Sequence, residues 1–163
     1  PETVRKARRM LTILAESTPQ TPNNSRLCQA LEMDRKQGLK VLHALRQAAL
    51  VGMLVEDADA LKRLCSPNKL FCDNTNLMYA LTPWPDKGTL REVFFNNQLS
   101  VGNTTAFPSR GDCLVNGKYL FEIGGERKTF AQIKDLPDSY LVVDGIEIGR
   151  GCRIPLWLFG FLY

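Results

Sequence analysis

Hydrophobic residues recur at helical spacing in several segments of the first fifty residues. Over residues 4–15 they return every three or four positions, which predicts a helix that ends before the breaker-rich run of residues 17–25. Ser25 can cap a short helix, and Asp34 can cap a longer one through about Ala49. Two helices joined by such a short turn predict a helix-turn-helix.

Two short apolar runs follow these helices. Residues 50–55 and 69–73 are predicted as strands, with a polar stretch between them. Three helices followed by two strands predict a winged helix-turn-helix as the N-terminal unit.

The longer helix has two unlike faces when it is projected at 100° per residue. The face expected in the core spans roughly 120° and consists of Gly38, Val41, Leu42, Leu45, Ala48 and Ala49. The opposite face carries Leu39 but no acidic residue, and its polar members are Arg35, Lys36, Lys40, His43, Arg46 and Gln47. Cations for phosphates, with Arg, Gln or His for base edges, are what a helix in the DNA major groove needs. A solvated basic face, or one docked on an acidic partner domain, is the alternative.

The rest of the chain alternates helical and strand-like patterns, which predicts an α/β unit. Helices are expected through Leu81, where residues 73–76 can form the cap, and over residues 89–99. Asn116-Gly117 between two apolar runs predicts a β-hairpin with a two-residue turn. The last elements are expected to be a short helix over 129–135 capped by Thr129, a buried strand over 139–144, and an apolar terminal segment over 154–163 that packs into this unit or a partner.

Composition and charge place these elements in an ordinary globular protein with two units. The 163 residues are 44% hydrophobic and 23% charged, and no apolar run reaches the ~18 residues of a membrane helix. Residues 1–50 hold nine Lys and Arg against four Asp and Glu, whereas residues 51–163 hold twelve against thirteen. We therefore expect an α+β protein with a basic winged-helix domain over 1–73 and an α/β domain over 74–163, without a membrane partner.

Cysteine usage favours a reducing compartment. The five cysteines include no C-x-x-C pair, and His43 is the single histidine, so no zinc pattern can be assembled. The chain begins with proline and has no signal-peptide pattern. We expect a cytoplasmic location and a piece of a longer polypeptide.

Carboxylates beside the predicted hairpin are the strongest candidates for chemistry. Asp112 and Glu122 flank it, while Glu92 and Gln132 fall on the neighbouring predicted helices. Magnesium-dependent nucleases hold a metal with carboxylates on adjacent strands and place a lysine two residues after the second acid. That position is Gly124 here.

A two-residue turn would also separate the two acids. It would place Asp112 opposite Phe121, on the other face from Glu122, unless a bulge or a bend at Gly111-Asp112 intervened. We therefore favour structural carboxylates and expect no metal site.

Other catalytic machinery is not recognisable in the sequence. The spacing from Gly111 to Gly117-Lys118 has one residue too many for a phosphate-binding loop, and Tyr119 follows where Ser or Thr is needed. The single histidine lies in the other predicted unit, which leaves a serine or cysteine nucleophile without a base. We expect no cofactor in this chain.

Several long segments resemble one family. The runs KLFCDNTNLMYALTP, GTLREVFFNNQL, GDCLVNGKYLFEIGGERKTFAQI and IPLWLFGFLY are similar to the C-terminal part of bacterial predicted AAA-type ATPases. The resemblance implies a preceding ATPase module that binds ATP and magnesium. It also implies a winged helix followed by a domain like the PD-(D/E)xK restriction-endonuclease fold.

Carried over by residue, the resemblance assigns Asp112 and Glu122 to the two acids of the nuclease motif and Glu92 and Gln132 to accessory positions. Gly124 replaces the motif lysine, and Lys128 is the candidate to take over its role. We expect a non-catalytic region that docks on the ATPase module and binds double-stranded DNA. A metal-dependent nuclease, or a protein-interaction module that forms a homo-oligomer through its aromatic tail, is the alternative.

Overall fold

The computed structural model describes residues 2–17, 24–56 and 68–162, and for residues 24–26 it describes the backbone alone. The chain is a mixed α+β protein. Its contacts divide it into two compact units, and the division falls at Leu90, within helix α6 (Lys87–Ser100). None of the helices in the described residues is both long and apolar enough to cross a membrane. Cys65 and most of the two polar stretches lie outside the described residues.

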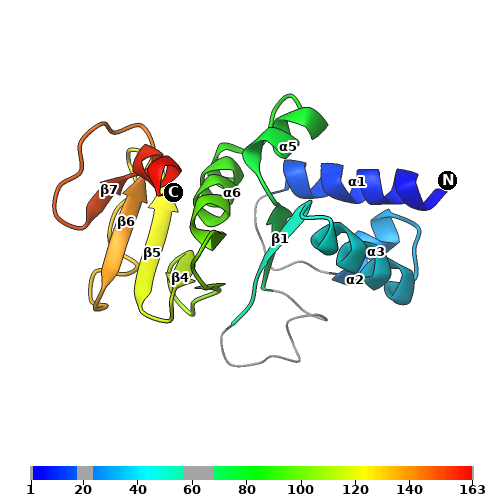
Figure 1. The fold of residues 1–163 in the computed structure, drawn as a ribbon, viewed down its shortest axis with the longest axis horizontal. Coiled ribbons are helices and arrows are strands. Elements are labelled where there is room, and N and C mark those ends of the chain that lie inside the picture. The colour runs from blue at the N-terminus through cyan, green and yellow to red at the C-terminus, as the bar shows by residue number, and fades with distance from the viewer. Residues whose placement is uncertain (1, 18–23, 57–67, 163) are drawn as a thin grey trace. The chain divides into compact units, whose positions relative to one another are not determined.

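The N-terminal unit combines helices with a two-stranded sheet (Figure 1). In chain order its elements are α1 (Glu2–Glu16), α2 (Asn24–Ala30), α3 (Arg35–Gln47), β1 (Val51–Leu54), β2 (Lys69–Cys72) and α5 (Thr75–Leu81). The strands are antiparallel, with Val51 opposite Cys72. Helix α5 contacts α1 and β2, so it belongs to this unit. The sequence analysis placed it in the second.

Side-chain caps fix where two of these helices begin. Asp34 accepts a hydrogen bond from the Gln37 amide at 2.8 Å, and Asn74 accepts one from the Leu77 amide at 2.9 Å. The Asp34 cap is therefore confirmed, whereas α2 begins at Asn24 and places Ser25 inside its first turn. These caps satisfy backbone amides that the helices cannot satisfy themselves.

The end of α3 differs from the prediction. The helix ends at Gln47, and Ala48 and Ala49, which were predicted to face the core, are exposed. Ala49 has a φ of 53°, in the left-handed region that ends helices. The chain turns there into β1, which begins two residues later at Val51.

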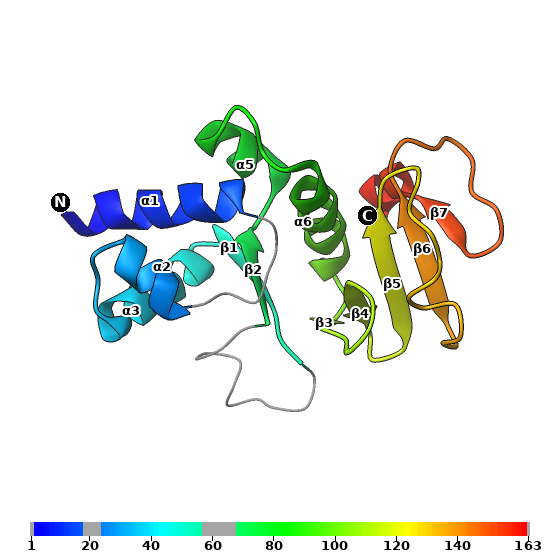
Figure 2. The ribbon, with the colours of Figure 1, turned by 180° about the vertical axis from the view of Figure 1, so that it is seen from behind.

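A five-stranded mixed sheet forms the centre of the C-terminal unit (Figure 2). Its elements are β3 (Thr105–Ala106), β4 (Cys113–Val115), β5 (Tyr119–Gly124), β6 (Ser139–Val143), β7 (Arg153–Pro155) and the 3₁₀ helix η1 (Leu156–Phe161). The strands lie in chain order across the sheet. Strands β3, β4 and β5 are antiparallel neighbours, and β5, β6 and β7 are parallel. The predicted hairpin and the predicted strand over 139–144 are confirmed.

The connection from β5 to β6 is not the helix predicted over 129–135. It consists of turns, with Ile133 donating to the Phe130 carbonyl and Leu136 donating to the Ile133 carbonyl. The Ser139 hydroxyl lies within hydrogen-bond distance of both the Ile133 and the Leu136 carbonyls, at 3.0 and 2.7 Å. Pro137 would end any helix by Leu136, and the Ile133 and Leu136 carbonyls face the Ser139 hydroxyl instead of helix amides further along the chain.

Aromatic rings from three elements form the core on one face of this sheet. The Phe95 ring of α6 lies 5.0 Å from that of Phe121 on β5 and 4.7 Å from that of Phe159 in η1. Leu156 is buried beside them, whereas Phe161 is 77% exposed. The terminal segment therefore packs into the unit through part of its apolar side chains.

The C-terminal segment should contribute strongly to stability through one ring. Phe159→Ala removes a buried ring from the aromatic core, so we expect it to cost about 3–5 kcal/mol of unfolding free energy. Urea denaturation measures the loss. Phe161→Ala is the matched control, because its exposed ring should leave stability within about 0.5 kcal/mol. Equal stability of the two variants would contradict this packing.

Candidate functional site

The polar face of α3 is the first candidate site. All six side chains predicted to face away from the core are exposed: Arg35, Lys36, Lys40, His43, Arg46 and Gln47. The opposite side is buried at Gly38, Val41, Leu42 and Leu45. At Gly38 a Cβ atom would collide with the Cys28 sulfur, so glycine permits the close approach of α3 to α2. The buried side is what holds the polar side outward.

The second candidate site begins at the hairpin of the C-terminal unit. Val115 pairs with Tyr119, so three residues, not two, form the loop. Asn116 and Gly117 adopt positive φ values of 53° and 64°, and Lys118 donates to the Val115 carbonyl. Asn-Gly thus forms the predicted turn, but Lys118 adds one residue and shifts the register of β4 against β5.

A bulge at the start of β4 places Asp112. Cys113 is the partner of Phe121, yet the Asp112 amide donates to the same Phe121 carbonyl at 2.8 Å. Two residues of one strand facing one of the other define a β-bulge. The Asp112 Oδ2 atom accepts from the Ile123 amide at 2.8 Å, so this carboxylate lies beside the backbone that carries Glu122.

Glu122 is the centre of the site. It is 1% exposed, and its Oε1 atom lies 2.5 Å from the Lys128 Nζ atom. With its amide oriented to satisfy both groups, the Gln132 side-chain nitrogen donates to Oε1 and Oε2 of Glu122 at 3.0 and 3.3 Å. The structure therefore brings together Glu122, Lys128 and Gln132, which the sequence analysis singled out.

Two glycines at the end of β5 leave room for cationic side chains. Residues 122 and 124 share a sheet face, and a Cβ atom on Gly124 would lie 2.6–2.7 Å from three carbons of the Lys128 side chain. A Cβ atom on Gly125 would lie 3.2–3.3 Å from the Arg91 guanidinium. The lysine can reach Glu122 because the motif position carries no side chain.

Glu92 belongs to the other face of the sheet. Neighbouring strand residues point to opposite faces, and Phe121 directs its ring toward α6, the helix that carries Glu92. The Glu92 carbonyl accepts from the Asn96 side chain at 2.8 Å. The structure thus places Glu92 on α6, the helix that packs on the Phe121 face of the sheet.

The residues at this corner do not fit the metal ion that the resemblance implies. Lys128 and Gln132 contact the Glu122 oxygens, and the Ile123 amide binds Asp112. Within residues 2–17, 24–56 and 68–162, no three His, Cys, Asp or Glu side chains gather closely enough to hold a metal. The Glu122 oxygens that a magnesium ion would bind therefore already face nitrogen donors.

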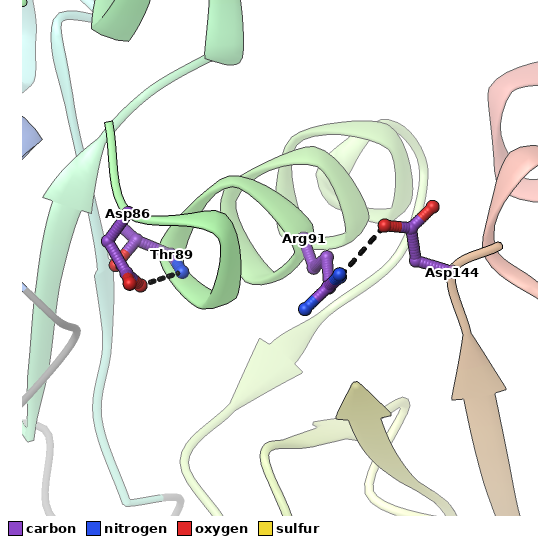
Figure 3. A network of polar contacts seen from close by, with 4 residues as sticks. All are labelled: Asp86, Thr89, Arg91 and Asp144. Atoms are coloured by element: carbon purple, nitrogen blue, oxygen red, sulfur yellow. Dashed lines mark hydrogen bonds and ion pairs between the residues drawn. The ribbon is translucent and has the colours of Figure 1, made fainter. Parts of the chain in front are cut away.

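Three arginines that the sequence analysis missed connect distant segments of the C-terminal unit, one through a carboxylate and two through backbone carbonyls. Arg91 donates to Asp144 at 2.9 Å (Figure 3), Arg110 donates to the Gln132 carbonyl, and Arg153 donates to the Glu126 carbonyl at 2.6 Å. Their partners lie 22 to 53 residues away in the chain. No local pattern reveals such pairs.

Two buried thiols are placed for packing rather than chemistry. Burial raises the pKa of Cys72 to about 11, with the Asp73 charge adding to the effect. Burial likewise raises the pKa of Cys28. A thiol that stays protonated at neutral pH is a poor nucleophile.

Comparison with known proteins adds no assignment. No protein-family model, curated protein or solved structure matches the chain.

Removing the Glu122 carboxylate should destabilise the protein. Glu122→Ala removes a buried side chain and its contacts with Lys128 and Gln132, and because both partners can reach water we expect a cost of about 1–3 kcal/mol. Urea denaturation measures the change. Glu126→Ala, at an exposed position four residues further on, is the control and should change stability by less than about 0.5 kcal/mol. A loss no larger than the control's would show that Glu122 does not hold this corner.

Proposed function

We propose that the N-terminal unit is a winged helix that binds double-stranded DNA by inserting α3 into the major groove. The main evidence is the polar face of α3, which is exposed and has no acidic residue. Its cations suit phosphates, and its Arg, His and Gln side chains can donate to base edges.

The order and spacing of the elements support this proposal. Three helices precede an antiparallel strand pair, and four residues join α2 to α3. In a helix-turn-helix the second helix of the motif enters the groove. Here that helix is α3, which carries the basic face.

Docking of α3 on an acidic protein surface is the competing interpretation. Both ligands would be attracted by the same cations, but only a duplex gives a salt dependence set by counterions released from phosphates. DNA is preferred because the face combines phosphate-binding lysines with planar donors suited to bases.

The resemblance to AAA-type ATPases supplies the proposed context. In this proposal the chain is a non-catalytic C-terminal region that docks on the ATPase module of its own polypeptide. Exposed apolar side chains at the C-terminal end of the second unit offer a surface for that contact: Trp157, Leu158, Phe161 and Leu162. Assembly of two copies through the same surface is the alternative.

Neutralising the cations of α3 tests DNA binding. Changing Arg35, Lys36, Lys40 and Arg46 together to Ala should weaken duplex binding and lower the salt slope by about 0.9 for each phosphate that the variant no longer neutralises. Fluorescence anisotropy with a labelled duplex at several salt concentrations measures both quantities. The fold should survive because these side chains lie opposite the buried stripe.

A control variant matches the change in net charge. Arg5, Arg8, Arg9 and Lys87 are also exposed cations of the N-terminal unit, and changing all four to Ala should weaken binding much less. Equal losses of affinity in both variants would indicate general attraction by charge. Undiminished binding by the α3 variant would end the proposal.

A PD-(D/E)xK-type nuclease is the second candidate function, favoured by one observation. The bulge places Asp112 beside the backbone of Glu122, and Lys128 supplies a cation where Gly124 lacks one. We nevertheless propose that the unit is non-catalytic, because its carboxylates already have protein partners. The protein should therefore leave plasmid and single-stranded DNA intact with magnesium or manganese, as gel assays would measure.

Positive results in that assay have a specific meaning. Cleavage that disappears in both Asp112→Ala and Glu122→Ala would establish a nuclease and point to Lys128 as its stand-in cation. Gly124→Lys should not create activity, because one lysine does not supply missing metal ligands.

A further inference from the structure

The residues around Glu122 do not fit the metal ion that the resemblance implies, and the reason is the position of Lys128. A carboxylate as deeply buried as Glu122 stays ionised at low cost only beside a cation or hydrogen-bond donors. In a metal site the cation is the ion itself. Here the Lys128 ammonium lies 2.5 Å from the carboxylate.

We propose that Lys128 is a resident cation that takes the chemical place of a divalent metal beside Glu122 and thereby closes the corner to metal ions. Removal of its charge should expose a latent oxygen-ligand site. The ligands would come from Glu122, Asp112 and the Gln132 side-chain oxygen.

The shape of the corner supports this assignment. Gly124 leaves the space in which the Lys128 stem crosses the strand toward Glu122, since a Cβ atom there would lie 2.6–2.7 Å from three of its carbons. The ammonium side chain is 33% exposed, whereas its partner carboxylate is 1% exposed. Lysine therefore approaches from the solvent side, as an ion from solution would.

The chemistry of the neighbours supports it as well. Magnesium and manganese prefer carboxylate and carbonyl oxygens. The Gln132 amide now presents its nitrogen to Glu122, and rotation of that amide would present its oxygen instead. Asp112 lies next to the same strand through its bond to the Ile123 amide.

Thermal unfolding with and without manganese tests the inference on the full chain. The unsubstituted protein should keep its Tm when manganese is added. Lys128→Met keeps the stem over Gly124 but removes the charge, so manganese should raise its Tm by about 4 °C at tenfold excess over the dissociation constant. The double variant Glu122→Gln with Lys128→Met should lose this response.

Control variants keep the test decisive. Lys134→Met, at an exposed position of the same connection, should show no manganese response. If Lys128→Met does not fold, Gly124→Ala serves in its place, because the added carbon must push the lysine away from Glu122. A manganese response of the unsubstituted protein equal to that of the variant would overturn the inference. A folded Lys128→Met or Gly124→Ala variant without any response would also overturn it.

None of these outcomes depends on DNA. If α3 does not bind DNA, the manganese result is unchanged. If Lys128 does not take the place of a metal, duplex binding by α3 is unchanged.

Discussion

A carboxylate buried inside a protein needs a cation within reach, and the arrangement of the C-terminal unit follows from that need at Glu122. The side chain is 1% exposed at the centre of a mixed sheet. Lys128 satisfies it only because Gly124 has no side chain and because the chain turns back immediately after β5. An unpaired charge buried at this depth would lower the free energy of unfolding by several kcal/mol. The turn after β5, Gly124 and Lys128 are therefore needed together.

The N-terminal unit shows how far local patterns can predict structure. Its helices and strands follow apolar spacing, and Asp34 caps α3 where predicted. The predicted burial of Val41, Leu42 and Leu45 is confirmed, because the helix period fixes which side faces the core. Ala48 and Ala49 continue the pattern, but small side chains add too little apolar area to extend the helix against the turn into β1.

The C-terminal unit could be predicted only in part, because side chains distant in sequence decide its details. Asn-Gly indicates a hairpin but does not reveal that Lys118 lengthens the loop and shifts the register. The expected helix over 129–135 is replaced by turns whose carbonyls bind Arg110 and Ser139. Gln132 was singled out on a predicted helix and Lys128 through the resemblance, but their convergence on Glu122 depends on that non-helical path.

The two units use their cations in different ways, and this difference bears on where an anionic partner would bind. In the C-terminal unit Arg91, Lys128 and Arg153 are directed to partners within the unit itself. In the N-terminal unit the cations of α3 project from an exposed face whose reverse is buried. A cation that already neutralises an internal acid gives little net attraction to a phosphate, whereas an exposed one releases counterions when it binds. The C-terminal unit also has exposed cations at Lys118, Arg127, Lys134 and Arg150, but those of α3 lie together on one face of a single helix, which favours α3 as the proposed contact with DNA.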